Sequence, residues 1–159
     1  MSLSSGRTPS SPRRRPGPNL SLTVQRASRA SHIPSDAKLR RFARAAAASG
    51  EVTLRYVGAA EARRLNREYR ERDYATNVLS FPYGEPGRSA RGDIVICASV
   101  VAREAREQRK DVEAHHAHLV VHGVLHLRGY DHELGEAGAR RMESLERRIL
   151  RQLGFPDPY

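Results

Sequence analysis

The sequence predicts an α+β fold, a small mixed sheet of four strands packed with about five helices. Two observations favour this class. Short segments with the two-residue apolar period of a β-strand are confined to residues 20–96, and the apolar patterns after them have helical spacing. Strands and helices also do not alternate strictly, as an α/β fold would require.

The strand-like segments are short and bounded by polar or turn-forming residues. They lie at residues 20–24, 52–57, 78–81 and 92–96, and Pro82 ends the third. The fourth contains the run Ile94, Val95 and Ile96, which is apolar on both faces. A strand of this kind is typical of the centre of a sheet.

The helix-like segments have apolar residues three and four positions apart. The first begins at residues 34–36, and we expect Gly50 to end it. In the second, over about residues 59–69, Ala62, Leu65 and Tyr69 are predicted to point inward. Ser99 is placed to cap the third helix, which is predicted over about residues 99–108. The fourth and fifth helices are predicted over about residues 112–127 and 135–153.

The length of 159 residues suits one domain, predicted over residues 19–159. Residues 1–18 are rich in Ser, Pro, Gly and Arg and predict a disordered extension. An organelle transit peptide or a segment that contacts RNA non-specifically are the alternative interpretations. Of the formal charge of +10, +6 lies in residues 1–35, so net charge alone is a weak argument for nucleic acid.

The cysteine and the hydropathy predict a soluble, cytoplasmic protein. Cys97 is the one cysteine, which excludes an internal disulfide framework and fits a reducing compartment. It closes an apolar run, so we expect a small buried side chain rather than a ligand or nucleophile. No segment has the roughly 18 apolar residues of a membrane span.

Three histidines near the C-terminal third have the spacing of a metal site. His122 and His126 are four residues apart, on one face of the predicted helix 112–127. Gly129 can adopt positive φ and turn the chain, so that His132 returns toward them. Three neutral imidazoles with one open position are typical of catalytic zinc. A helix with partly buried, hydrogen-bonded histidines is the alternative.

The same spacing occurs in the metzincin protease signature H-E-x-x-H-x-x-G-x-x-H. This chain has Gly123 where those proteases carry the glutamate that serves as general base. Hydrolysis of a peptide on zinc needs such a base and an acid for the amine that leaves. The missing carboxylate therefore argues against a protease.

The complete string HGVLHLRGYDH at residues 122–132 resembles the YbeY endoribonucleases. The resemblance covers about residues 20–159, and the extension at residues 1–18 has no counterpart. It is carried by further segments: LNREYR at 65–70, DYATNVLSFP at 73–82, GDIVIC at 92–97, HHAHLVV at 115–121, MESLE at 142–146 and DPY at 157–159.

The resemblance implies a single-strand-specific, metal-dependent endoribonuclease with this α+β fold. It implies action on ribosomal RNA, in 3′-end maturation of the small-subunit RNA and in ribosome quality control, with the small ribosomal subunit as a partner. His122, His126 and His132 match the family's ligands to one zinc ion per chain. Arg70 matches an arginine that is functional in the family, and a guanidinium suits an anionic phosphodiester. From the residues alone, an ordinary surface or ion-paired arginine is the favoured alternative.

Three further residues are candidates for the site, each with an alternative role. Asn77 is predicted to orient RNA, or else it caps a turn. His118 lies one turn before His122, so we expect it to contact substrate; as a fourth ligand it would make the site structural. Asp131 is placed to hydrogen-bond a ligand imidazole, or else it stabilises the turn. We expect His32 and His116 to be solvated.

Two other functions stay open at this point. One is a metzincin-like metallohydrolase with another substrate, against which Gly123 counts. The other is a non-catalytic ribosome-binding module in which zinc only holds the fold.

Overall fold

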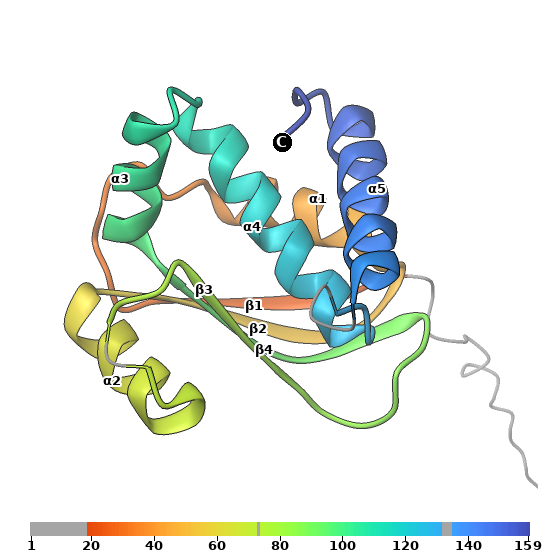
Figure 1. The fold of residues 1–159 in the computed structure, drawn as a ribbon, viewed down its shortest axis with the longest axis horizontal. Helices are drawn as coiled ribbons and strands as arrows, with labels where there is room; N and C mark the ends of the chain where they lie inside the picture. Colours follow the sequence, from red (N-terminus) through yellow and green to blue (C-terminus); the bar gives the residue numbers. More distant parts are fainter. Residues whose placement is uncertain (1–18, 73, 132–134) are drawn as a thin grey trace, which may run out of the picture.

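The computed structural model describes residues 19–72, 74–131 and 135–159. Its sheet has the order β1-β2-β4-β3 (Figure 1). The parallel strands are β1 (Ser21–Arg26), β2 (Ser49–Val57) and β4 (Ser89–Cys97), and β3 (Val78–Pro82) is antiparallel to β4. The predicted mixed sheet of four strands is confirmed, and the segment that is apolar on both faces lies inside the sheet, in β4.

Within the described residues, five helices pack on this sheet, as predicted. They are α1 (Asp36–Ala46), α2 (Ala59–Arg70), α3 (Ala98–Glu107), α4 (Val112–Leu127) and α5 (Glu136–Gln152). Figure 1 shows α1, α3, α4 and α5 on one side of the sheet and α2 on the other. No helix of the described part of the chain is long and apolar enough to cross a membrane.

Helix α4 is the centre of the larger core. It packs against β3 and β4 below and against α1, α3 and α5 around it, so most of its side chains are buried. Gly123 permits the close approach to the sheet, because a Cβ atom there would lie 2.9 Å from Ile94 Cδ1. The position where a metzincin carries its glutamate therefore faces the sheet in this protein.

The end of the first helix differs from its prediction. Helix α1 begins after Ser35, whose side chain accepts a hydrogen bond from the Lys38 amide, but it ends at Ala46 rather than near Gly50. Gly50 belongs to β2 and has φ +129°. A Cβ atom there would lie 1.9 Å from the Ala90 carbonyl oxygen, so the glycine permits strand pairing.

Two further local predictions were wrong. Tyr69 is 64% exposed, whereas Asn66 is buried together with the predicted Ala62, and the Asn66 side-chain amide donates to the Tyr74 carbonyl. Ser99 lies inside α3, which begins after Cys97 without a side-chain cap. Cys97 itself is buried, as expected. The predicted extension at residues 1–18 lies outside the described residues.

The prediction that His116 is solvated was also wrong. His116 is fully buried, with Nδ1 2.9 Å from the Tyr56 hydroxyl and Nε2 2.9 Å from His32 Nδ1. His32 is partly buried rather than solvated. Burial lowers the pKa of His116 to about 3, so its ring is neutral and joins β2 to α4.

Candidate active site

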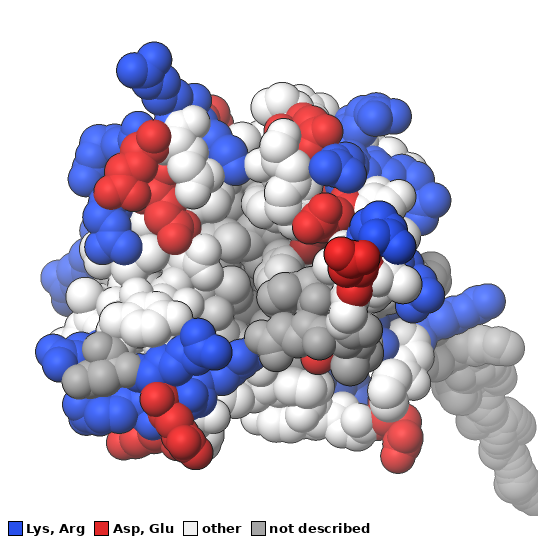
Figure 2. All heavy atoms as spheres, in the orientation of Figure 1, with Lys and Arg blue, Asp and Glu red and all other residues white. Residues whose placement is uncertain are grey.

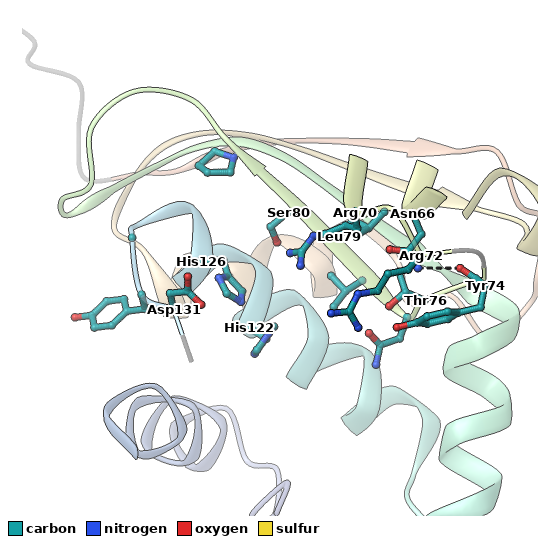
Figure 3. A pocket seen from close by; sticks show the side chains of 15 residues that line it. Asn66, Arg70, Arg72, Tyr74, Thr76, Leu79, Ser80, His122, His126 and Asp131 are labelled. Atoms are coloured by element: carbon teal, nitrogen blue, oxygen red, sulfur yellow. Dashed lines mark hydrogen bonds between the residues drawn. The ribbon is translucent and has the colours of Figure 1, made fainter. Parts of the chain in front are cut away.

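A cleft of about 580 Å³ lies between α4, the end of α2 and strand β3. Figure 3 shows its two sides: His122 and His126 project from α4, and Arg70, Arg72 and Ser80 lie across from them. The described lining residues are Asn66, Arg70, Arg72, Tyr74, Thr76, Asn77, Val78, Leu79, Ser80, Pro82, His122, His126, Gly129, Tyr130 and Asp131.

The two cleft histidines are neighbours on one helix face, as their spacing predicts. The ring centroids of His122 and His126 lie 4.7 Å apart. Two imidazoles one turn apart are a frequent half of a zinc site, because both rings can reach one ion. His132, the third predicted ligand, lies outside the described residues, and its convergence on this point stays a prediction.

The turn after α4 has the predicted glycine. Gly129 has φ +103°, and its amide donates to the His126 carbonyl. A Cβ atom there would lie 2.6 Å from Pro86 Cβ, so both conformation and packing require glycine. The reversal brings Asp131 to the lining of the same cleft.

A buried carboxylate supports the histidines from α5. Glu146 is fully buried, with Oε2 2.5 Å from His122 Nδ1 and Oε1 3.0 Å from His118 Nε2; it also accepts a hydrogen bond from the Tyr159 hydroxyl. Burial alone would raise the pKa of Glu146, but the hydrogen bonds from His118, His122 and Tyr159 and the electrostatic attraction of His122 outweigh it and lower the pKa to about 2. Glu146 is therefore an ionised acceptor at neutral pH.

This carboxylate sets the tautomer of His122. A carboxylate only accepts hydrogen bonds, so the ring proton lies on Nδ1 and the lone pair on Nε2. That tautomer is the one with which a histidine binds metal through Nε2 while a carboxylate holds its other nitrogen. The residues on α4 and α5 thus fit a metal ion in this cleft.

The sequence-based reasoning did not find Glu146. The feature of the sequence that could have identified it is its spacing. Glu146 lies four residues after Met142 and three before Ile149, on the buried face of α5. An acidic residue within an apolar stripe requires a buried partner.

His118 occupies a different position from the one expected. It lies behind His122, beside a separate cavity of about 160 Å³, and its ring centroid is 5.3 Å from that of Tyr159. The ligand atoms of His118, His122 and Glu146 all lie within 4.8 Å of one another, so this group could hold a metal ion by spacing alone. Contact of His118 with substrate remains a prediction.

The wall opposite the histidines is basic and polar. Helix α2 ends at Arg70 because Glu71 adopts the left-handed conformation, with φ 57°. Arg70 and Arg72 both line the cleft after this change of direction. Figure 2 shows basic side chains gathered over α2, with acidic side chains among them. An anionic ligand would therefore meet guanidinium groups on this wall.

Asn77 lines the cleft and is anchored on its other side. Its side-chain amide donates to Glu104 Oε1 at 3.0 Å, and its backbone carbonyl accepts from the Cys97 backbone amide at 3.0 Å. His115 Nε2 lies 2.9 Å from the same Glu104 oxygen. The position of Asn77 in the cleft is compatible with the predicted contact with RNA, whereas its side-chain amide bonds α3 rather than the turn that the alternative role would cap.

Comparison with known proteins identifies the family. The sequence profile described as Endoribonuclease YbeY matches residues 25–154. The chain belongs to the YbeY endoribonuclease family. YbeY endoribonucleases from Aromatoleum aromaticum and Pseudomonas putida are 57% and 53% identical to it, over 88% of this chain and 92% and 93% of theirs.

A solved structure has the same fold. The solution structure of a Thermotoga maritima protein superposes with a TM-score of 0.62 at 26% identity, covering 83% of this chain and 88% of that one. The resemblance in residues 20–159 is thus confirmed as membership of a family of endoribonucleases, which are hydrolases that act on RNA. The two alternatives, a metzincin-like metallohydrolase with another substrate and a non-catalytic ribosome-binding module with structural zinc, are not favoured.

Proposed function

We propose that this protein is a cytoplasmic, zinc-dependent endoribonuclease that cleaves single-stranded ribosomal RNA. Its role would be 3′-end maturation of the small-subunit RNA and ribosome quality control, in contact with the small ribosomal subunit. The observation that carries the proposal is the cleft in which two imidazoles of α4 lie opposite Arg70 and Arg72. The family, whose members are named endoribonucleases, supports the same reaction.

In this proposal His122, His126 and His132 hold one zinc ion. The choice of zinc rests on the donor set, because three neutral imidazoles suit Zn²⁺, whereas Mg²⁺ and Ca²⁺ prefer oxygen ligands. When bound, the ion supplies a Lewis acid that polarises a phosphate oxygen and acidifies water. Glu146 holds His122 in the orientation that this requires.

The arginines bind the scissile phosphate and stabilise negative charge. Cleavage of a phosphodiester gathers charge on its non-bridging oxygens, and a planar guanidinium donates two parallel hydrogen bonds to such a group. The position of Arg70 at the end of α2, on the wall facing the histidines, supports this role. An arginine at the same helix end that did not line a cleft would have the features of an ordinary surface residue.

The remaining candidates position the site. Asn77 would orient the RNA with its side-chain carbonyl, since its amide is held by Glu104. Asp131 would accept a hydrogen bond from a ligand imidazole and keep its tautomer. The predicted substrate contact of His118 would require RNA to reach past His122.

The deciding experiment combines metal analysis with cleavage of single-stranded RNA. Purified protein should contain about one equivalent of zinc and cleave single-stranded but not duplex RNA. His126→Ala should lose both zinc and cleavage while circular dichroism shows that the fold remains. Cleavage that persists unchanged in the variant would contradict the proposal.

Chelation separates a catalytic from a structural ion. If cleavage stops and the thermal unfolding transition stays cooperative, the ion serves the reaction. If removal of metal melts the protein outright, the ion holds the fold and the non-catalytic alternative is correct.

A further inference from the structure

The sheet has a second exposed surface on the side opposite the cleft. We call it the aromatic face and define it by Tyr69 on α2, Phe81 on β3 and Tyr83 just after β3. Tyr69 is 64% and Tyr83 56% exposed, and Phe81 is partly buried. Large aromatic side chains exposed together commonly mark a binding surface.

The aromatic face lines a groove of about 540 Å³ over the sheet. The ring centroids of Tyr69 and Phe81 lie 5.3 Å apart with the rings edge to face, and the Tyr83 hydroxyl donates to Asp93. Figure 1 shows that α2 is the described helix on this side, so much of the sheet surface is left uncovered by a helix. The other lining residues are Gln25, Thr53, Arg55, Glu61, Leu65, Asp93 and Val95.

Among the lining residues, one cation and one anion neutralise each other. Arg55 forms a bidentate ion pair with Glu61, at 3.1 and 3.2 Å, whereas the Asp93 carboxylate accepts from the neutral Tyr83 hydroxyl and keeps its charge. The face therefore offers π surfaces and no excess of positive charge. Such a surface suits nucleobases better than phosphates, which the arginines of the cleft would hold.

A single strand separates the aromatic face from the cleft. Side chains of β3 alternate, so that Ser80 and Pro82 line the cleft and Phe81, between them, points to the groove on the other side. On α2, Arg70 lines the cleft and its neighbour Tyr69 lines the groove. Arg70 and Tyr69 are neighbours in sequence, so an RNA strand that leaves the cleft beside Arg70 would next reach the Tyr69 side chain.

From this continuity we infer that the aromatic face binds unpaired bases of the RNA strand that the cleft cleaves. The inference rests on the proposed function. Stacking on tyrosine and phenylalanine tolerates any base, because every base has a π-face. A paired base is already stacked inside a duplex, so the face would also favour single-stranded over double-stranded substrate.

The test compares Tyr69→Ala/Tyr83→Ala with the matched control Tyr69→Phe/Tyr83→Phe. Substrates are a dinucleotide, which has only the two nucleosides that flank the scissile phosphate, and a single-stranded RNA of about sixteen nucleotides. The alanine variant should raise KM for the longer RNA about tenfold per lost ring and leave the shorter unchanged. The phenylalanine variant, which keeps both rings, should behave as wild type on both.

An abasic stretch in the longer RNA provides the second readout. Wild-type protein should bind the abasic RNA about as weakly as the alanine variant binds the intact RNA. The alanine variant should bind the abasic and the intact RNA equally well. Thermal unfolding of both variants should match wild type, since the altered side chains are exposed.

The outcomes distinguish the two proposals. If wild-type protein cleaves no RNA, the proposed function itself fails. If wild type cleaves but the alanine variant binds and cleaves the longer RNA equally well, the role of the aromatic face is refuted, and the face is left for a protein partner. An equal loss on short and long RNA would refute it as well.

Discussion

The Glu146 carboxylate lies 2.5 Å from His122 Nδ1 and joins the last helix to the helix that carries the cleft histidines. The contact spans 24 residues of sequence. Because Glu146 is fully buried, water cannot replace it as the acceptor for His122. The tautomer of a predicted metal ligand thus depends on the packing of α5 against α4.

Glu146→Gln should weaken zinc binding by about 10- to 100-fold, the usual effect of losing a carboxylate behind a histidine ligand. An amide oxygen accepts more weakly than a carboxylate, and its NH₂ group cannot accept from the second histidine. Competition against a chromophoric chelator measures the affinity. Glu136→Gln is the matched control, since Glu136 is exposed at the start of α5. Equal affinities in the two variants would refute a supporting role.

Arg70→Ala should lower kcat/KM on single-stranded RNA by about 10²- to 10³-fold, as expected for a group that stabilises charge in the transition state. Zinc content should not change, because Arg70 lies across the cleft from the histidines. Arg64→Ala serves as control, since Arg64 lies on the same helix but pairs with Glu61 and Glu68 instead of lining the cleft. Loss of zinc in Arg70→Ala would instead show an architectural role.

Gly123→Ala should destabilise the fold by about 1–3 kcal/mol, because the added methyl group would overpack the interface between α4 and β4. Its carbon would lie 2.9 Å from Ile94 Cδ1, closer than van der Waals contact allows. Urea unfolding measures the change. Gly87→Ala is the comparison, since a Cβ atom at Gly87 has no neighbour within 4 Å. Equal stability of the two variants would contradict this account of the glycine.

His116 should make the protein sensitive to acid. Its pKa is about 3 in the folded state against an ordinary 6.5, so the unfolded chain binds a proton that the folded one excludes. The contribution of His116 to the free energy of unfolding is fully present above pH 6.5 and decreases as the pH falls toward 3. Between pH 6.5 and about pH 4 the loss from this group is roughly 3 kcal/mol.

The measurement is urea unfolding at several pH values, with His116→Gln as the comparison. Glutamine can still hydrogen-bond Tyr56 but does not titrate, so its stability should decrease less over the same range. Parallel pH profiles for the two proteins would show that His116 does not carry the effect.

Patterns local in sequence predicted the elements well. The predicted range 112–127 for the histidine helix agrees with α4, because Asp111 caps it and Gly129 ends it through contacts within a few residues. The face shared by His122 and His126 follows from helix geometry alone. The four strands and five helices of the described residues follow from apolar periods that each segment carries in itself.

Predictions that depended on a partner far away in sequence were less successful. Tyr69 has the spacing of an inward residue of α2, but the described sheet surface beside it is open, and Asn66 is buried in its place. Gly50 has the signature of a helix end, yet it serves the pairing of β2 with β4. In both cases the local pattern was compatible with two environments, and packing selected one.

By itself, the sequence determined the class of fold, the family and the presence of His122, His126 and Arg70 as candidates for one site. Only the tertiary structure decided that Glu146 is the buried acceptor behind His122, that His116 is an interior histidine, and that one edge strand divides the cleft from an aromatic face. The physical reason is that hydrogen-bond partners and burial are set by segments dozens of residues apart, which a periodic pattern along one segment cannot specify.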